Sequence, residues 1–313
     1  MARLLSTTVW SMMALIVTCW NSQGHMIVTR IAELYLNSTQ PIVLRRAAKN
    51  LRTLGRFFKE TPNSLLEASV MPDFLNYENN GFLMYYHYSD FPHFYKNDDD
   101  DPIPGAMFPF GIEYAYQSAI NIIIDSQDAE KQQNATVKAG LMDSLMLRFI
   151  LHLTGDAHQP LHAASLFSET FLNQTLKGGD MGGNLIPVDD IFQRNITNLH
   201  SLWDSCLGLY EEMKEMPLSE DNKTIVTERA EELMKRYPRS SFENEVMDID
   251  MGNWVKESFE YVTSFVYSDI DIFPILSPQY IYNGRQICTM RMALAGYRLA
   301  QVLSILYEPR PGL

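Results

Sequence analysis

Apolar positions recur at helical spacing along most of the chain. Residues 111–126 show the pattern most clearly, with apolar side chains on one face at Ile112, Tyr116, Ala119, Ile120 and Ile123. Similar spacing predicts helices over residues 26–36, 41–58, 136–158, 189–209, 222–236, 250–268 and 286–307, and the helix over 41–58 has a basic face. We therefore expect a mainly α fold in a single domain.

Two segments interrupt the helical pattern. Residues 178–184 read GGDMGGN, and four glycines in seven residues exclude a helix interior. This segment predicts a loop or small hairpin. The tyrosine-rich residues 81–90 are predicted to be extended.

The first nineteen residues differ from the rest of the chain. One basic residue precedes an apolar run over residues 9–17, which is too short to span a bilayer and is typical of a secretory signal. A signal peptide over residues 1–19 predicts a mature domain over residues 20–313 that begins at Trp20. Such a protein would be secreted or held in the lumen of the secretory or lysosomal pathway. A buried N-terminal helix is the alternative.

Two further features agree with export. Cleavage after Cys19 leaves Cys206 and Cys288, which an oxidising compartment would allow to form one disulfide, although two buried free thiols are also possible. A bond between them would close a loop of about 80 residues and contribute roughly 4 kcal/mol. Sequons for N-glycosylation occur at Asn37, Asn134, Asn173, Asn195 and Asn222.

The net charge of −13 argues against nucleic-acid binding through a broad basic surface. It does not exclude a protein that grips phosphate through bound cations. No other stretch has 18 uninterrupted apolar residues, so we expect no stable membrane association.

The strongest chemical signal lies in residues 148–162, RFILHLTGDAHQPLH. His152 and Asp156 stand four residues apart and share one helical face in an apolar setting, and His200 and Asp204 repeat this spacing. One such pair could be a salt bridge. Two pairs with a nearby His162 favour a metal, because buried imidazole and carboxylate groups are costly unless paired or metal-bound. Imidazole and carboxylate ligands without thiolate suit zinc in a site open to water.

Several short motifs occur in order along the chain: W-x4-H at residues 20–25, Asp73 in an apolar context, HYxD at 87–90, HxxxDxHQPLH at 152–162, GGDxGGN at 178–184 and NLHxxWD at 198–204. This order resembles the S1/P1 nuclease family, and the likeness continues to AGYRLAQVL near the C-terminus. The resemblance implies a helical fold related to that of zinc-dependent phospholipase C. It also implies a single-strand nuclease that acts as a 3′-nucleotidase.

The resemblance further implies three Zn²⁺ ions held by nine residues: Trp20, His25, Asp73, His87, His152, Asp156, His162, His200 and Asp204. Asp156 would bridge two ions, the second of which would also take His25 and the amine and carbonyl of Trp20. As the catalytic residue, Asp73 would orient the attacking hydroxide. His158 faces away from His152 and is interpreted as structural, and His93 is expected at the surface.

The resemblance also implies the substrate contacts. Tyr88 would stack on a base, Asp90 would bind the base edge and Asn184 would contact the nucleotide near the metals; for Tyr88 an ordinary core position is the alternative. The expected substrates are single-stranded DNA, RNA and nucleotides, the products 5′-phosphates, and the expected state a monomer. Many family members have Arg at the position of Asn76, so the phosphate contact is expected to differ here.

Three other interpretations remain open at this point. A zinc-dependent phospholipase C would share the fold and cluster, although its last ligand pair is typically His-x3-Glu rather than the present His200-x3-Asp204. A non-catalytic secreted glycoprotein that binds zinc is a second alternative. A metal-free helical protein is the third.

Overall fold

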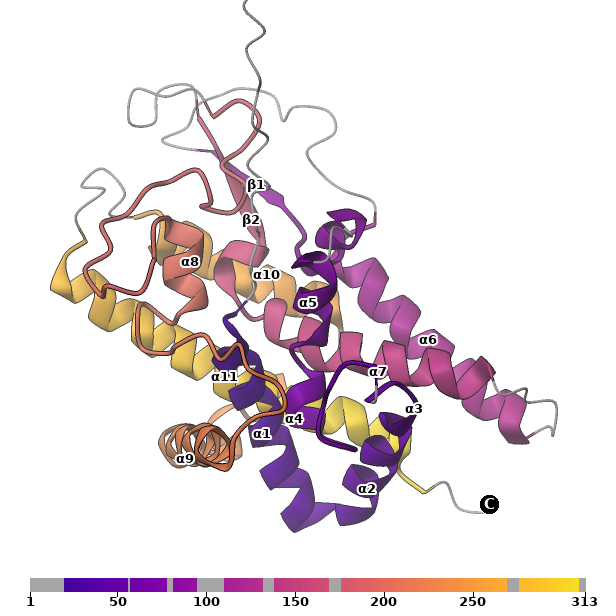
Figure 1. Ribbon diagram of the computed structural model, residues 1–313. Helices are drawn as coiled ribbons and strands as arrows, with labels where there is room; N and C mark the ends of the chain where they lie inside the picture. Colours follow the sequence, from indigo (N-terminus) through magenta and orange to yellow (C-terminus); the bar gives the residue numbers. More distant parts are fainter. Residues whose placement is uncertain are drawn as a thin grey trace, which may run out of the picture.

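The computed structural model describes residues 20–55, 57–77, 81–94, 110–131, 138–168, 176–268 and 276–309. Its elements are mostly helices, arranged as Figure 1 shows. In chain order they are α1 (Ser22–Thr39), α2 (Pro41–Asn50), α3 (Arg52–Gly55), α4 (Leu65–Ala68), α5 (Met71–Tyr77), η1 (Gly81–His87), β1 (Phe91–Phe94), α6 (Ile112–Lys131), α7 (Lys138–Asp156), η3 (Pro160–His162), β2 (Ala164–Phe167), α8 (Leu199–Asp204), α9 (Glu220–Arg236), η5 (Arg239–Ser241), η6 (Glu245–Met247), α10 (Met251–Tyr261), η7 (Val262–Val266) and α11 (Pro278–Tyr307). The mainly α prediction is confirmed.

Local side-chain chemistry explains where the principal helices begin. The Asn21 side chain accepts a hydrogen bond from the Gly24 amide at 3.0 Å and caps α1. The Ser277 hydroxyl caps α11 in the same way, and Pro278 occupies its first position, where no amide hydrogen is needed. Asn198 and Ser201 form a reciprocal capping box at the start of α8.

The long helix α11 crosses the molecule and packs against α1, as Figure 1 shows. At their crossing a Cβ on Gly296 would lie 2.5 Å from the Ile31 Cβ, so a glycine is needed for the two helices to approach this closely. Met292, Leu299 and Leu303 are completely buried along α11. The packing fixes α1, which carries His25, within the molecule.

A short parallel pair of strands joins two distant parts of the chain. Phe91 in β1 pairs with Ala164 in β2. Just before the strands the Ser89 amide donates a hydrogen bond to the His162 carbonyl at 2.9 Å. The pairing therefore holds residues 87–90 beside residues 160–164. After β2, Ser168 and Leu176 form an antiparallel bridge, so the chain reverses there.

Three predicted elements differ from the structure. The helix expected over residues 41–58 is split into α2 and α3, and residues 81–87 form a 3-10 helix rather than an extended segment. Within 189–209 only Leu199–Asp204 is helical. The Asp190 carboxylate accepts hydrogen bonds from the amides of Arg194 and Asn195, which stabilises a turn in place of the helix. Positive φ angles at Cys206 and Leu207 then end α8.

Cys206 and Cys288 are neighbours in the core. The structure has Cys206 and Cys288 as free, buried thiols. Burial and the neighbouring Cys206 thiol raise the pKa of Cys288. The disulfide expected between Cys206 and Cys288 stays a prediction, and here the two residues are neighbouring thiols.

The remaining predictions about export concern the surface and the leader. Asn37 and Asn195 are exposed, and Asn222 is half-buried at the start of α9. Asn134, Asn173 and the leader over residues 1–19 lie outside the described residues. Within the described ranges, no helix has the length and apolar character needed to cross a membrane.

Candidate metal centre

The histidines and carboxylates singled out in the sequence come from six elements and meet in the interior. His25 lies in the first turn of α1, Asp73 in α5 and His87 at the end of η1. The last turns of α7 carry His152 and Asp156, η3 carries His162, and α8 carries His200 and Asp204. The imidazoles are at most 2% exposed, and the side chain of Asp73 is 14% exposed. Two neighbouring clusters result.

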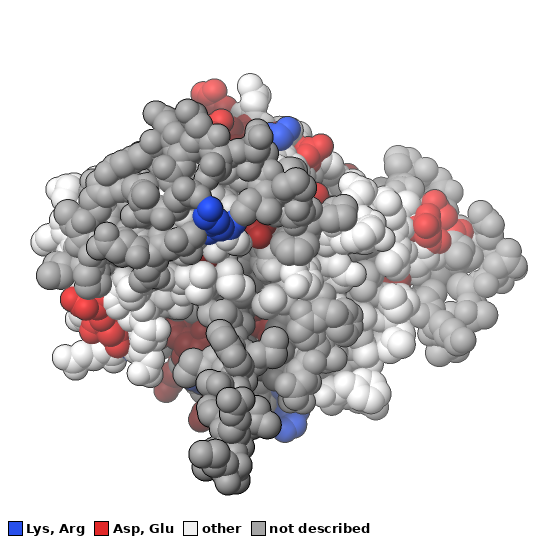
Figure 2. All heavy atoms as spheres, turned by 90° about the horizontal axis from the view of Figure 1, so that it is seen from above, with Lys and Arg blue, Asp and Glu red and all other residues white. Residues whose placement is uncertain are grey.

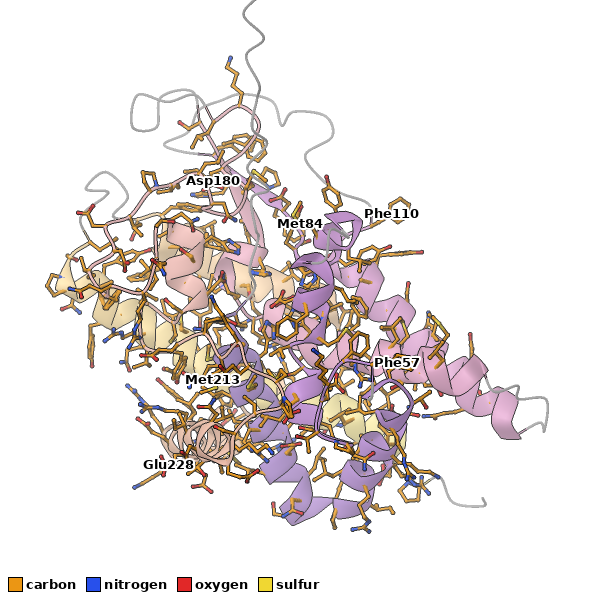
Figure 3. The ribbon with its side chains drawn as sticks, in the orientation of Figure 1. Phe57, Met84, Phe110, Asp180, Met213 and Glu228 are labelled. Carbon is orange, nitrogen blue, oxygen red and sulfur yellow. The ribbon has the colours of Figure 1, made fainter. Side chains whose placement is uncertain are left out.

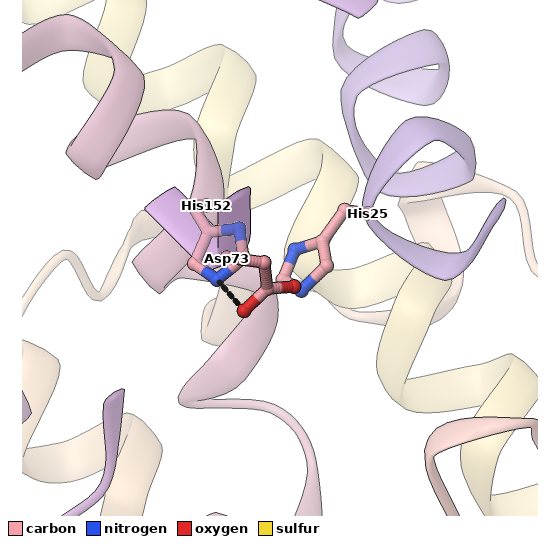
Figure 4. A group of neighbouring side chains, drawn as sticks. All are labelled: His25, Asp73 and His152. Carbon is pink, nitrogen blue, oxygen red and sulfur yellow. Dashed lines mark ion pairs between the residues drawn. The ribbon is translucent and has the colours of Figure 1, made fainter. Parts of the chain in front are cut away.

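The first cluster is centred on two carboxylates. Asp73 Oδ1 lies 3.5 Å from His152 Nε2 and 4.0 Å from His87 Nδ1. Figure 4 shows the Asp73 carboxylate beside the rings of His25 and His152, and these two rings stack at 3.8 Å between centroids. His25, Asp73 and His152 place one potential ligand atom each within 4.8 Å of one another.

Asp156 contacts three imidazoles of the same cluster. Its Oδ1 is 3.3 Å from His25 Nε2, and its Oδ2 is 3.0 Å from His87 Nδ1 and 3.3 Å from His152 Nε2. The two oxygens therefore face different imidazole groups. This arrangement suits a carboxylate that bridges two cations.

The second cluster contains His162, His200 and Asp204. Their potential ligand atoms lie within 4.8 Å of one another. Asp204 Oδ1 is 3.9 Å from His162 Nε2, and Asp204 Oδ2 is 3.5 Å from His200 Nε2. The Gln159 amide also donates a hydrogen bond to Asp204 Oδ1 at 2.9 Å and holds this carboxylate in place.

Backbone carbonyl groups orient three of the imidazoles. The Nδ1 atoms of His152, His162 and His200 donate hydrogen bonds to the carbonyls of Ser69, His87 and Gly182 at 2.7, 2.7 and 2.6 Å, respectively. A proton on Nδ1 leaves Nε2 with a free lone pair. Each Nε2 atom faces its cluster, which is how metal-binding histidines are commonly oriented.

Several polar atoms in the clusters are buried without a hydrogen-bond partner. They are His25 Nδ1, His25 Nε2, Asp73 Oδ1, Asp156 Oδ1 and His162 Nε2. Orphaned buried polar atoms are costly unless something else satisfies them. Divalent cations would satisfy nearly all of these atoms, so the donor set fits a metal centre better than a closed hydrogen-bond network.

The imidazoles of the first cluster stabilise the ionised forms of its two carboxylates. Burial opposes ionisation of Asp156, but His152, His25 and His87 together hold its pKa well below the usual range. The pKa of Asp73 is lowered by His152, His87 and His25 in the same way, again against the effect of burial. Burial lowers the pKa of His162 to about 3, so this imidazole is neutral at pH 7. Ionised carboxylates and a neutral His162 are forms that bind metals. Against the effect of burial, Asp156 and Asp73 raise the pKa of His152 to about 9, so a metal would have to displace the proton of His152.

The N-terminal segment is fixed against this centre. The Trp20 indole donates a hydrogen bond to the Gly155 carbonyl at 2.8 Å, and the Asn21 amide donates one to the Asp204 carbonyl at 3.0 Å. A Cβ on Gly155 would lie 2.8 Å from His25 Nδ1, so only glycine permits this approach of α1 to α7. The Trp20 side chain is therefore bonded next to Asp156 of the first cluster, and the following residue is bonded to Asp204 of the second. The backbone of Trp20 is held close to both clusters.

The proposed substrate contacts lie beside the strands. Tyr88 is half-buried and packs edge-on against Tyr85, with ring centroids 6.1 Å apart. Asp90 has a φ of 63°, and its carboxyl group bonds to Ser165. The Asn184 amide donates a hydrogen bond to the Met181 carbonyl at 2.9 Å, and its side chain is mostly buried. The Asn76 side chain lies outside the described residues.

Sequence reasoning missed a second buried carboxylate beside Asp90. Asp180, labelled in Figure 3, is fully buried and accepts hydrogen bonds from the Leu166 amide and the Tyr267 hydroxyl at 2.8 and 2.7 Å. Its carboxylate also accepts a hydrogen bond from Ser165 at 3.3 Å. The only available signal was an acidic residue within GGDMGGN. Its partners come from β2 and from Tyr267, directly after η7, which sequence spacing does not link.

The two remaining histidines have other roles. His158 is fully buried, donates from Nδ1 to the Thr154 carbonyl and accepts at Nε2 from Arg298, 2.9 Å away. It therefore points away from the clusters. His93 was expected at the surface, but it is half-buried and stacks on Tyr267 with 5.5 Å between centroids, because β1 turns it inward.

A cavity of about 280 Å³ adjoins the second cluster. Asp204, Asn21, Arg194, Asn195 and Glu212 contribute to its lining. Space for a ligand is therefore present beside one of the clustered carboxylates.

Comparison with known proteins extends over nearly the whole chain. A family model described as S1/P1 Nuclease matches residues 20–308. Among curated relatives, Endonuclease 2 of Arabidopsis thaliana is 24% identical over 92% of this chain and 90% of its own length. Nuclease S1 of Aspergillus oryzae is 25% identical over 92% of this chain and 91% of its own length, and Endonuclease 4 of Arabidopsis thaliana is 24% identical over 94% and 91%.

Proposed function

The chain belongs to the S1/P1 nuclease family, and from this premise we propose that it is an exported, zinc-dependent hydrolase of single-stranded DNA and RNA. It releases 5′-phosphate products and also acts as a 3′-nucleotidase. As a family member it is a hydrolase of phosphodiester bonds, and its substrates are nucleic acids. The relatives named as nucleases favour this activity over that of a phospholipase C.

One observation carries the zinc proposal. Five buried ring-nitrogen and carboxylate atoms of the two clusters have no hydrogen-bond partner, and all belong to residues of the expected ligand set. We assign the first ion to Asp73, His87, His152 and Asp156, the second to Asp156, His25 and the amine and carbonyl of Trp20, and the third to His162, His200 and Asp204. The Trp20 amine becomes a ligand only after removal of residues 1–19.

The bound metals would supply positive charge for the phosphate and would lower the pKa of water. The protein groups provide position and polarity. Asp73 Oδ1 is buried and has no hydrogen-bond partner, so it would accept a hydrogen bond from the attacking hydroxide and hold it in line with the phosphorus. The bond from phosphorus to the 3′-oxygen then breaks. The departing 3′-oxygen takes a proton from solvent and becomes a 3′-hydroxyl, and the phosphate stays on the 5′-oxygen of the other fragment.

The groups beside the strands would account for the preference for single strands. Tyr88 offers an aromatic face, and Asp90, held by Ser165, offers a carboxyl group for the base edge. A base paired within a duplex would have to leave its stack to reach these groups. Duplex DNA is therefore a poor substrate.

The test is elemental analysis of the purified mature protein, together with hydrolysis of single-stranded DNA before and after chelation. We expect about three zinc ions per chain, loss of activity on chelation and 5′-phosphate ends. Asp73→Asn should lower turnover by about 10²-fold or more, because the attacking hydroxide is no longer held in line with the phosphorus. Asp125→Asn on the exposed face of α6 is the matched control. Full turnover of Asp73→Asn with full zinc content would exclude the role of Asp73, and release of a phosphorylated headgroup from phosphatidylcholine alone would favour the phospholipase.

A further inference from the structure

One stretch of this acidic protein is strongly basic. No Asp or Glu occurs between Glu33 and Glu60, whereas six Lys and Arg do. The net charge of the chain is −13, so the remainder carries −19. Such a local excess of positive charge is the usual electrostatic footprint of a site for a polyanion.

The structure places these cations on one exposed face. Arg45, Lys49 and Arg52 are exposed and are separated by four and three residues, so they form one stripe along α2 and into α3. Val43 and Ala47, on the opposite side of α2, are completely buried in the core. Within the described residues the three cations form no ion pair, so their charge is not neutralised by the protein.

An exposed aromatic ring accompanies the stripe. The side chain of Phe57 is 76% exposed, and Figure 3 shows it beside α3. Lys59, two residues further on, is also exposed. Cations with an exposed aromatic ring are the combination with which proteins bind single strands without sequence preference, because phosphates meet the charges and a base stacks on the ring.

The stripe lies apart from the metal centre. Figure 1 shows α2 and α3 at the end of the molecule opposite β1, β2 and α8. His25 stands near the start of α1 and α2 follows its end, so about 14 residues of helix, ~21 Å, separate His25 from the beginning of α2. On the opposite face, where Figure 2 colours side chains, Lys and Arg appear only at isolated points.

We propose that Arg45, Lys49, Arg52 and Phe57 form a second binding site, or exosite, for the phosphate backbone of a single-stranded nucleic acid. The proposal rests on the nuclease function proposed above. At ~3.4 Å per stacked nucleotide the length of ~21 Å along α1 corresponds to roughly six nucleotides. A long strand can therefore occupy both sites, whereas a mononucleotide reaches only the metal centre. A lipid surface fits less well, because the apolar face of α2 is buried and unavailable for insertion.

The direct test is binding of a nuclease-resistant phosphorothioate single-stranded 30-mer at 50 and 200 mM salt. The test variant combines Arg45→Gln, Lys49→Gln and Arg52→Gln. The control combines Arg229→Gln, Lys235→Gln and Arg236→Gln on α9, which changes the net charge equally at exposed positions. Each phosphate contact contributes about −0.7 to the slope of log K against log[salt] for a single strand. Between 50 and 200 mM salt, the affinity of the wild type should therefore fall by a factor roughly twentyfold larger than that of the test variant, which lacks three contacts. The control should match the wild type.

Two further measurements separate the sources of binding. Phe57→Ala should weaken 30-mer binding by about fivefold or more without changing the salt slope, since a stacked ring carries no charge. Hydrolysis of a 3′-mononucleotide should be unchanged in every variant, whereas kcat/KM for a long strand should fall in the test variant.

Equal salt slopes for test variant and wild type, or binding to phosphatidylserine vesicles without binding to the 30-mer, would overturn the exosite. A protein that binds the 30-mer through the stripe yet hydrolyses nothing would retain the exosite and refute the proposed function.

Discussion

The Trp20 indole nitrogen donates a hydrogen bond to the Gly155 carbonyl at 2.8 Å, joining residues 135 positions apart. Gly155 directly precedes Asp156, which contacts three imidazoles of the first cluster. The bond therefore couples the beginning of the predicted mature chain to the centre of the candidate metal site. Substitutions at Trp20 should consequently change metal binding at this site.

Trp20→Phe removes this bond while keeping an aromatic ring. The Gly155 carbonyl loses its buried partner, so we expect a loss of about 1–3 kcal/mol in the free energy of unfolding. Zinc content and turnover should fall as well, because the Trp20 backbone is no longer fixed. Tyr307→Phe removes the hydrogen bond between Asn50 and the Tyr307 hydroxyl, far from the centre, and should leave zinc content unchanged. Equal zinc content in both variants would refute the coupling.

Asp90→Asn should change how stability depends on pH. Burial and the nearby Asp180 raise the pKa of Asp90 to about 7, against about 3.9 in an unfolded chain. Between these values the folded state binds more protons than the unfolded state, so stability falls as pH rises through this window. The side-chain amide of the Asp90→Asn variant does not titrate, so the variant does not lose this part of its stability as pH rises.

We therefore expect the Tm of Asp90→Asn, relative to the wild type, to be higher at pH 8 than at pH 5. Burial raises the pKa of Asp180 to about 6, so Asp180 also makes stability fall as pH rises. Because Asp180 is present in both proteins, its effect is common to the two Tm values. Tyr88 and Tyr267 also face this group and are not expected to titrate in the window, because burial raises their pKa values further. An identical Tm difference at both pH values would contradict this assignment.

Glu257→Gln should destabilise the fold beneath the metal centre. The Glu257 carboxylate accepts hydrogen bonds from Arg291 at 2.7 Å and from Arg298 at 2.6 and 2.7 Å, and both guanidinium groups are buried. Removal of its charge leaves two buried cations uncompensated. We expect a loss of about 3 kcal/mol, the low end of the range for such pairs, because Glu257 is 30% exposed.

Urea unfolding measures this loss. Glu232→Gln disrupts the exposed pair with Arg229 and should change the free energy of unfolding by less than about 1 kcal/mol. Similar effects of the two substitutions would show that the buried network contributes no more than a surface ion pair.

The thiols of Cys206 and Cys288 should resist a thiol reagent in the folded protein. Both are buried, and burial raises the pKa of Cys288, so little thiolate is present. Titration with a chromogenic disulfide reagent should detect no thiol in the native protein and two after unfolding without reductant. Detection of none after unfolding would mean that the exported protein carries the disulfide predicted from its sequence.

Much of the site can be inferred from the chain alone. The pairs His152–Asp156 and His200–Asp204 depend only on a four-residue helical spacing, which places both side chains on one face whatever surrounds them. The expected grouping of His162 with the second pair agrees with the geometry of the second cluster. Helices α6, α7, α9 and α11 follow apolar periodicity, and their boundaries differ from prediction by only a few residues, except at the start of α11.

Contacts between distant segments decided the rest. The orientations of His152 and His162 depend on the carbonyls of Ser69 and His87, which lie more than seventy residues away in the chain. The helix expected over residues 189–209 gave way to a turn stabilised by Asp190, and the parallel pairing of β1 with β2 has no signal in either strand. Periodicity reports which side of a helix is buried. It cannot report which groups meet there, because hydrogen bonds and close packing between elements form only once the whole chain is folded.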